Sequence, residues 1–260
     1  MRVLCVGDVY APAGCEAALK YIPELKKEYG IDFTIVNGEN SAEGNGITPE
    51  SAELLFGAGA DVITGGNHTL RRSEAYEMLD ANPCLLRPHN MEAEYGGGYV
   101  LCDLGKYRAA VINLLGQVYF DRVKSSNPFT AAEELADRAK REGAKQIFVD
   151  FHAEATSEKR AMGFFLDGKV SAVFGTHTHI QTADGQVLPE GTGYITDLGM
   201  TGVIDSVLGV RKDIIINRLK AGGGSEKFLQ ADGKCMLNGC VFETDDVTGL
   251  TVSVKRIYRA

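Results

Sequence analysis

The chain has 260 residues, with 27 Lys and Arg against 35 Asp and Glu, so its formal net charge is −8. Hydrophobic residues make up 44% of the chain and charged residues 24%, proportions that exclude wholesale disorder. The acidic balance argues against long nucleic acid as a partner, because phosphate backbones need clustered Lys and Arg. No apolar run approaches the roughly 20 residues that span a bilayer, so no membrane partner is expected.

The first half of the chain alternates short apolar runs with helical patterns. Strands are predicted at residues 3–6, 33–36 and 62–64. A helix is predicted after each of these strands, at residues 18–29, 48–55 and 71–79. Pro23 should kink the first of these helices. Thr48-Pro49 is typical of an N-cap followed by a first-turn proline.

The second half begins with a hairpin predicted at residues 99–103 and 108–113. Thr130 and Glu133 have the spacing of a capping box, for a helix that ends near Gly143. Further strands are predicted at residues 147–151 and 170–174, and short strands with turns follow residue 185, ending with 250–258. The stretch Gly222-Gly223-Gly224-Ser225 is expected to be a flexible loop.

This order of elements predicts the fold class. Strands that alternate with helices indicate a mainly parallel sheet, and the later hairpins indicate an antiparallel part. We therefore expect one α/β domain over residues 1–260, built as a two-sheet sandwich with helices outside.

The N-terminus and the cysteines indicate a cytoplasmic protein. The first apolar run is too short for a signal peptide. None of the six cysteines forms a C-x-x-C pair, so neither a zinc ribbon nor a redox motif is indicated. Cys5 and Cys102 are expected to be buried thiols. Cys235 and Cys240 could pair, although a cytoplasmic location disfavours the disulfide.

Five of the predicted strands run directly into a polar cluster. The clusters are Gly7-Asp8, Gly38-Glu39-Asn40, Gly66-Asn67-His68, His152-Ala153-Glu154 and Gly175-Thr176-His177-Thr178-His179. In α/β sheets, ligands bind at the carboxyl ends of parallel strands. The five clusters are therefore expected to converge on one edge of the sheet.

The side chains of these clusters suit a metal centre. Four of the five histidines lie in the clusters, and only His89 does not. Together with carboxylates and amides, and without a thiolate, they favour Fe, Mn, Zn, Co or Ni over Ca or a structural zinc. They exceed what one tetrahedral ion takes, so a pair of ions sharing a carboxylate is expected. Two ions about 3.5–4 Å apart can hold a hydroxide and clamp a phosphoryl group for in-line attack.

In this order, the clusters resemble the five motifs of calcineurin-like metallophosphoesterases. The longer stretches at residues 38–42, 46–48, 65–68 and 151–159 are similar to those of the bacterial YmdB-type phosphodiesterases. The resemblance covers nearly the whole chain. It implies the calcineurin-like metallophosphoesterase fold, a four-layer βαβ sandwich of mixed sheets. It also implies hydrolysis of cyclic nucleotides, with 2′,3′-cyclic ones preferred and 3′,5′-cyclic ones as further substrates.

The resemblance also implies roles for individual residues. The implied ligands are Asp8, Asn40 and His179 for one ion, Asn67, His152 and His177 for the other, and Glu39 as the bridge. His68 would be the catalytic residue beside the phosphate, protonating or stabilising the departing oxygen. The cofactors would be two divalent or mixed-valence ions, Fe in the first place and Mn or Zn as alternatives. A metal-bridging hydroxide would attack phosphorus.

The chain differs from the family pattern at two places. Tyr10 stands where the wider metallophosphoesterases have a histidine. The YmdB type lacks that histidine too, which leaves Asn40 as the extra ligand. The turn expected at residues 11–16, from Ala11 to Glu16, has no arginine where the YmdB type has a Gly-x-x-Gly-Arg-like turn.

Several other polar residues have both a structural and a functional interpretation. They are Arg71, Arg72, His89, Glu154, Thr156, Asp197 and Thr201. The two arginines are either solvated or steer phosphate, and His89 is either a loop residue or approaches the substrate. Glu154 and Thr156 either orient ligands or are surface turn residues. Asp197 and Thr201 either line the cleft or serve the structure alone.

The predicted function is a cytoplasmic phosphodiesterase that uses two metal ions and acts on a small cyclic nucleotide. Two alternatives stay open, because fold and ligands alone do not select the substrate. One is another phosphoesterase, acting on a phosphomonoester or on RNA ends. The other is a regulatory metal-binding protein with slow turnover. A homo-oligomer is expected on general grounds only.

Overall fold

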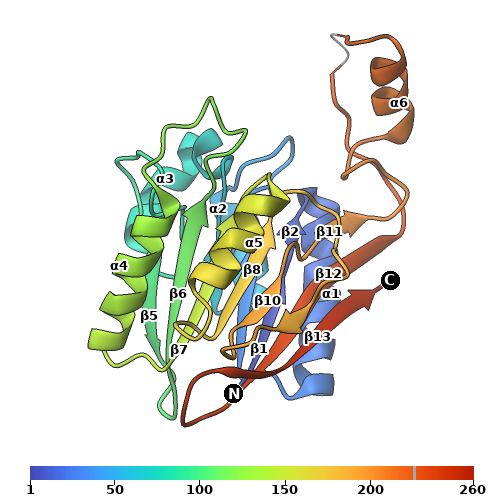
Figure 1. Cartoon of the computed structure of the whole chain (residues 1–260). Helices are drawn as coiled ribbons and strands as arrows, with labels where there is room; N and C mark the ends of the chain where they lie inside the picture. Colours follow the sequence, from blue (N-terminus) through green and yellow to red (C-terminus); the bar gives the residue numbers. More distant parts are fainter. Residues whose placement is uncertain (225–226) are drawn as a thin grey trace.

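The computed structural model describes residues 1–224 and 227–260, so Ser225 of the predicted glycine-rich loop lies outside the described residues. Within these ranges the chain forms two mixed β-sheets, one of seven strands and one of six. The sheets pack face to face, and helices cover their outer faces (Figure 1). The predicted α/β class and four-layer arrangement are confirmed.

The first sheet has the strand order β2-β11-β12-β1-β3-β4, with β13 beside β12. Its strands are β1 Arg2–Val6, β2 Asp8–Val9, β3 Phe33–Asn37, β4 Val62–Thr64, β11 Met200–Val203, β12 Cys235–Thr244 and β13 Thr251–Arg259. β1, β3 and β4 are parallel neighbours, so their carboxyl ends lie at the same edge. β12, from the far end of the chain, runs antiparallel to β1 in the middle of this sheet.

The second sheet has the order β5-β6-β7-β8-β10-β9. Its strands are β5 Tyr99–Asp103, β6 Arg108–Leu115, β7 Gln146–His152, β8 Ala172–Thr176, β9 Gln186–Val187 and β10 Gly193–Ile195. β5 and β6 form the predicted hairpin. β6, β7 and β8 are parallel, and their carboxyl ends form a second common edge.

The central strands β1, β3, β7 and β8 are buried on both faces, which explains their continuous apolar runs. In β1, Val3 and Cys5 belong to the core between the sheets, together with Phe148 and Phe174 of the second sheet. Alternate residues such as Leu4 point to the other face and join the core beneath the helices of the first sheet. Both sheets therefore hold their carboxyl edges in fixed positions.

Helices cover both outer faces. The α-helices in the described residues are α1 Ala11–Tyr29, α2 Pro49–Gly57, α3 Tyr76–Ala81, α4 Pro128–Arg141, α5 Thr156–Phe165 and α6 Lys212–Lys220. α1, α2 and α3 cover the first sheet, and α4 and α5 cover the second. Thr48 caps α2, with Pro49 in its first turn, as predicted. None of the helices in the described part of the chain is long and apolar enough to cross a membrane.

The turn predicted at residues 11–16 is wrong, because this segment forms the start of α1. Pro12 is typical of turns, but a proline near a helix N-terminus is also well suited to the first helical turn. Gly14 lies so close to the backbone of Thr201 that a Cβ would stand 2.5 Å from its carbonyl oxygen. This glycine therefore lets α1 pack against β11. Pro23 lies inside α1, which continues to Tyr29.

Three further expectations are corrected. The helix predicted at residues 71–79 is instead two 3₁₀ turns, Thr69–Arg71 and Ser73–Ala75, followed by α3. α6 was not expected, and it projects away from the sheets (Figure 1). Cys102 is only partly buried, because its strand lies at a sheet edge, whereas Cys5 is buried as expected. All six cysteines, each within the described residues, are free thiols, so Cys235 and Cys240 do not pair.

The capping box predicted at Thr130 and Glu133 is also wrong. α4 begins earlier, and its N-cap is Asn127, whose side-chain oxygen accepts hydrogen bonds from the backbone N–H groups of Phe129 (2.8 Å) and Thr130 (3.2 Å).

Asn127→Ala should lower the free energy of unfolding by about 1 kcal/mol, because these N–H groups lose their partner. Thr130→Ala, on the exposed face of the same turn, should leave it unchanged. Urea denaturation of both variants measures the difference, and an equal loss in both would contradict the assignment.

Candidate metal centre

All eight residues proposed from the sequence meet where the carboxyl edges of the two sheets lie together. The first sheet supplies five of them, after β1, β3 and β4: Asp8, Glu39, Asn40, Asn67 and His68. The second sheet supplies His152 at the end of β7, and His177 and His179 after β8. The clusters therefore converge as expected, but at the shared edge of two sheets rather than at the edge of one.

Glu39 lies at the middle of this group. Its Oε1 is 2.8 Å from Nδ2 of Asn40, 3.2 Å from Nδ1 of His68 and 3.4 Å from Nε2 of His152. Its Oε2 accepts the backbone N–H of His68 at 2.8 Å. Burial opposes ionisation of this carboxyl, yet the charge and hydrogen bonds of His152 and His68 hold its pKa well below the usual range. Glu39 is therefore a buried carboxylate facing several nitrogen atoms.

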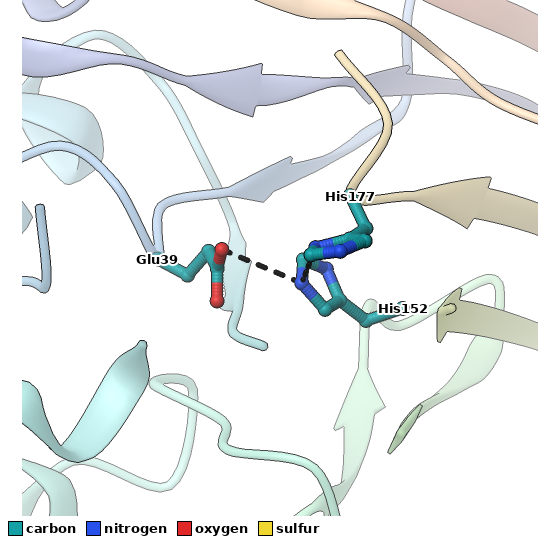
Figure 2. A group of neighbouring side chains, drawn as sticks. All are labelled: Glu39, His152 and His177. Carbon is teal, nitrogen blue, oxygen red and sulfur yellow. Dashed lines mark hydrogen bonds and ion pairs between the residues drawn. The ribbon is translucent and has the colours of Figure 1, made fainter. Parts of the chain in front are cut away.

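His152 connects the two sheets. Its Nε2 lies 3.1 Å from Nδ1 of His177 (Figure 2). The same atom lies 2.9 Å from Oδ1 of Asn67. Its Nδ1 lies 2.8 Å from the hydroxyl of Thr176. Burial alone would lower the pKa of His152, but the charges of Glu39 and Asp8 and a hydrogen bond to Glu39 raise it to about 9. The surroundings of His152 thus favour a positive charge at this point.

His177 is kept neutral at the same place. Burial and the charge of His152 lower the pKa of His177 to about 2. Its Nε2 lies 3.0 Å from a carboxylate oxygen of Glu154, which can only accept, so the ring proton belongs on Nε2. The lone pair of Nδ1 is then directed at His152. A metal-ligating histidine is commonly oriented in this way, by a carboxylate on its other nitrogen.

Asp8 and His179 form the other side of the group. The Oδ2 atom of Asp8 accepts the backbone N–H of His177 at 3.1 Å, and its Oδ1 atom lies 3.9 Å from Nε2 of His179. Burial raises the pKa of Asp8, against the opposing charges of His179 and His152. Among the described residues, Oδ1 of Asp8 and Nδ1 of His179 are buried without a hydrogen-bond partner. A buried carboxylate oxygen of this kind is costly unless something positive fills the place beside it.

Asn40 lies in the group, but its amide is oriented differently from a ligand. Its Oδ1 faces Nδ1 of His68 at 3.0 Å, and its Nδ2 faces Glu39 and, at 3.4 Å, Nε2 of His179. To bind an ion beside His179 through oxygen, the amide must turn over. Tyr10, which stands in place of the family histidine, packs its ring edge-on against His179 at a centroid distance of 5.9 Å.

The arrangement of donors fits a metal ion. Glu39, His152 and His177 offer ligand atoms that all lie within 4.8 Å of one another. A Cβ added at Gly66 would overlap Oε2 of Glu39 and Nε2 of His152, so only glycine leaves this space open. Together with the unpartnered oxygen of Asp8, this space and its nitrogen and oxygen donors suit a transition metal such as Fe, Mn or Zn.

Gly66→Ala should therefore abolish or strongly weaken metal binding, because its methyl group would occupy the space between Glu39 and His152. We expect the Mn²⁺ affinity to fall at least about tenfold while the far-UV circular dichroism stays unchanged. Gly57→Ala, where an added Cβ meets nothing within 4 Å, is the matched control. Isothermal titration of both variants measures the effect. Wild-type affinity in Gly66→Ala would contradict the location of the site.

The structure separates the remaining candidates. Glu154 contacts His177, which supports its orienting role. Arg72 donates hydrogen bonds to the backbone carbonyls of Asn45 (3.2 Å) and Glu43, so it has a structural role. His89 lies on the surface, outside the cluster. The other candidates lie at different places. Arg71 is exposed, and Thr156 is the first residue of α5. Thr201 is buried in β11, and Asp197 is buried beside the cluster.

Sequence reasoning missed Asp150, a fully buried carboxylate in β7. Its Oδ1 accepts the hydroxyl of Thr176 at 2.7 Å, and its Oδ2 accepts Nδ2 of Asn37 at 3.0 Å. Burial raises its pKa to about 6, although these hydrogen bonds oppose the shift. Thr176 thus links Asp150 to His152 and orients its ring. An aspartate inside the otherwise apolar run at residues 147–151 was the available signal.

Comparison with known proteins agrees with the resemblance seen in the sequence motifs. The family described as YmdB-like protein matches residues 4–257. A 2′,3′-cyclic-nucleotide 2′-phosphodiesterase of Bacillus subtilis (strain 168) is 46% identical over 259 residues, which cover 99% of this chain and 96% of that protein.

Solved structures agree with this relationship. The crystal structure of a novel phosphatase from Mycoplasma pneumoniae superimposes with a TM-score of 0.93 at 35% identity, covering 100% of this chain and 93% of that one. A 5′-nucleotidase precursor from Thermus thermophilus superimposes with a TM-score of 0.59 at 10% identity, covering 99% of this chain and 54% of that one. The latter likeness concerns the fold alone.

Proposed function

The chain belongs to the YmdB-like protein family, and from this membership we propose that it is a metal-dependent phosphodiesterase acting on cyclic nucleotides. We propose 2′,3′-cyclic nucleotides as the preferred substrates and 3′,5′-cyclic ones as secondary substrates. The observation that carries the proposal is the buried group of carboxylate, amide and imidazole donors around Glu39. The name of the 46% identical relative supports the choice of substrate.

We further propose how the residues divide between two ions. Asp8, Asn40 and His179 would hold one ion, Asn67, His152 and His177 the other, and Glu39 would lie between them. The contacts from Glu39 towards both groups support this division. When bound, the ions would supply Lewis acidity towards the phosphoryl oxygens and lower the pKa of a water molecule. Fe is proposed first, with Mn or Zn as alternatives.

The chain's own residues prepare the site for this chemistry. Asp8, Glu39 and His152 are almost completely buried, so water is largely excluded around them. Glu39, which can only accept, holds a proton at Nδ1 of His68. The side chain of His68 is 29% exposed and so remains accessible from solvent. We propose that Nε2 of His68 gives a proton to the ribose oxygen that leaves phosphorus.

The bond proposed to break is the one between phosphorus and the 2′ oxygen, as in the name of the Bacillus relative. Water then adds its oxygen to phosphorus, the 2′ oxygen takes up a proton, and the product is a nucleoside 3′-phosphate. We also propose that residues 1–260 act as a single domain, since one core joins the two sheets. A cytoplasmic location is proposed because free thiols, including the partly exposed Cys84, persist in a reducing compartment.

The test is a substrate panel with protein of known metal content, purified with little exposure to air. The panel contains 2′,3′-cyclic AMP, 3′,5′-cyclic AMP, a chromogenic phosphodiester and a phosphomonoester. We expect the highest kcat/KM for 2′,3′-cyclic AMP, with 3′-AMP as product. A higher kcat/KM for the phosphomonoester would replace the proposal by a phosphatase. Metal-loaded protein without turnover on any ester would favour a regulatory role.

A further inference from the structure

A buried ion pair lies behind the turn His177-Thr178-His179. Nζ of Lys159, on α5, is 2.6 Å from Oδ2 of Asp197 and 2.8 Å from the carbonyl oxygen of Thr176. The two charged side chains are 1% and 0% exposed. Removing two charges from water is costly, and their attraction repays the cost only when further hydrogen bonds satisfy the remaining polar atoms. The further partners of Asp197 therefore indicate what the pair does.

Those partners lie in the turn itself. Oδ2 of Asp197 accepts the hydroxyl of Thr178 at 2.7 Å and its backbone N–H at 3.1 Å. Oδ1 accepts the backbone N–H of Gly199 at 2.8 Å. Thr178 is therefore held at both its backbone and its side chain by one carboxylate. It is also the residue between the two histidines that face the metal centre.

The turn needs such support because its backbone is strained. His177 has a φ of 101° and His179 a φ of 64°, in the region that favours glycine. Residues persist there only when the surrounding structure fixes them. If Thr178 were released, both histidines would be free to relax towards negative φ, which would turn their rings away from Glu39 and Asp8.

The same ion pair ties the turn to the rest of the centre. α5 follows β7 directly, and β7 ends in His152. Lys159 extends from this helix to the carbonyl of Thr176, whose hydroxyl is hydrogen-bonded to His152. The pair therefore fixes the position of β8 and its turn relative to β7 and His152.

We propose that Asp197, with its charge balanced by Lys159, is a positioning residue that holds Thr178 so that His177 and His179 present their nitrogens to the metal centre. This proposal rests on the proposed function, in which both histidines bind ions. Asp197 and Lys159 would touch neither the substrate nor an ion. Their effect on catalysis passes through the geometry of the turn.

The test compares Thr178→Val with Thr178→Ser, using Mn²⁺ as the probe. Valine removes only the hydroxyl that Asp197 accepts, and serine keeps it. We expect Thr178→Val to weaken the Mn²⁺ affinity about tenfold to a hundredfold, the usual effect of removing a hydrogen bond behind a metal ligand. Thr178→Ser should restore most of the affinity. The melting temperature of the metal-free protein should be similar in both variants.

A second comparison removes the ion pair as a unit. Lys159→Met combined with Asp197→Leu leaves no single buried charge behind, so folding should survive better than with either change alone. We expect this protein to bind fewer Mn²⁺ ions per chain, with an altered Mn²⁺ EPR spectrum. A role limited to stability would change the melting temperature and leave the spectrum of the loaded protein unchanged. If the double variant does not fold, the comparison of Thr178→Val with Thr178→Ser decides whether Asp197 has the positioning role.

Two outcomes are contrary and can be told apart. Wild-type Mn²⁺ affinity and stoichiometry in Thr178→Val would overturn the positioning role and leave the proposed function intact. Failure of the wild-type protein to bind Mn²⁺, Fe²⁺ or Zn²⁺ would overturn the proposed function, and the positioning role with it.

Discussion

Replacing Glu39 with glutamine is expected to lower kcat/KM for 2′,3′-cyclic AMP by at least about a hundredfold, or about 2.7 kcal/mol of transition-state stabilisation. Glu39 is the carboxylate that contacts Asn40, His68 and His152, and it is buried. Glutamine has nearly the same shape but carries no charge, so two cations could no longer share it. Elemental analysis should find fewer ions per chain in the variant.

The control for this experiment is Glu53→Gln, the same change on the exposed face of α2. It should keep the activity and the metal content of the wild type. Circular dichroism and the melting temperature show whether Glu39→Gln is folded. A folded Glu39→Gln protein with wild-type metal content and wild-type rate would show that Glu39 is not part of the metal centre.

Replacing His68 with alanine is expected to lower kcat for 2′,3′-cyclic AMP by about a hundredfold to ten-thousandfold while the metal content stays unchanged. The imidazole adjoins Glu39 and Asn40 but is not among the proposed ligands. A ribose oxygen is a poor leaving group without a proton. A phenolate that leaves easily needs less help, so the chromogenic phosphodiester should lose much less rate.

His89→Ala is the matched control, because His89 is a surface histidine outside the cluster. Its rates on both esters should equal those of the wild type. An equal loss on both esters in His68→Ala would contradict proton transfer to the leaving oxygen. Loss of bound metal in His68→Ala would instead make His68 a ligand.

The candidate site was predictable from the sequence because it follows from strand ends. Each apolar run stops where the backbone leaves the core, and the polar residues Asp8, Glu39, His152 and His177 follow at those points. Parallel strands carry such residues to a common edge wherever they lie in the chain. The assignment of these strands to one sheet or the other could not be predicted, because hydrophobic periodicity and composition do not specify which strands pair.

The positioning contacts could not be predicted, since they join distant residues. Lys159 and Asp197 are 38 positions apart, and nothing local distinguishes Lys159 from a solvated lysine on a helix. Boundary errors had a local cause. Residues 11–16 and Thr130 satisfy two patterns at once, and packing against β11 or the cap from Asn127 decides between them.

The most direct test of the metal centre follows the rate of 2′,3′-cyclic AMP hydrolysis while metal ions are added back to metal-free protein. If the cluster is a centre for two ions, the metal-free protein should be inactive, and the rate should reach its maximum near two bound ions per chain. A maximum near one ion would contradict the shared role of Glu39. Full activity in protein shown by elemental analysis to hold no metal would contradict a metal-dependent reaction at this cluster.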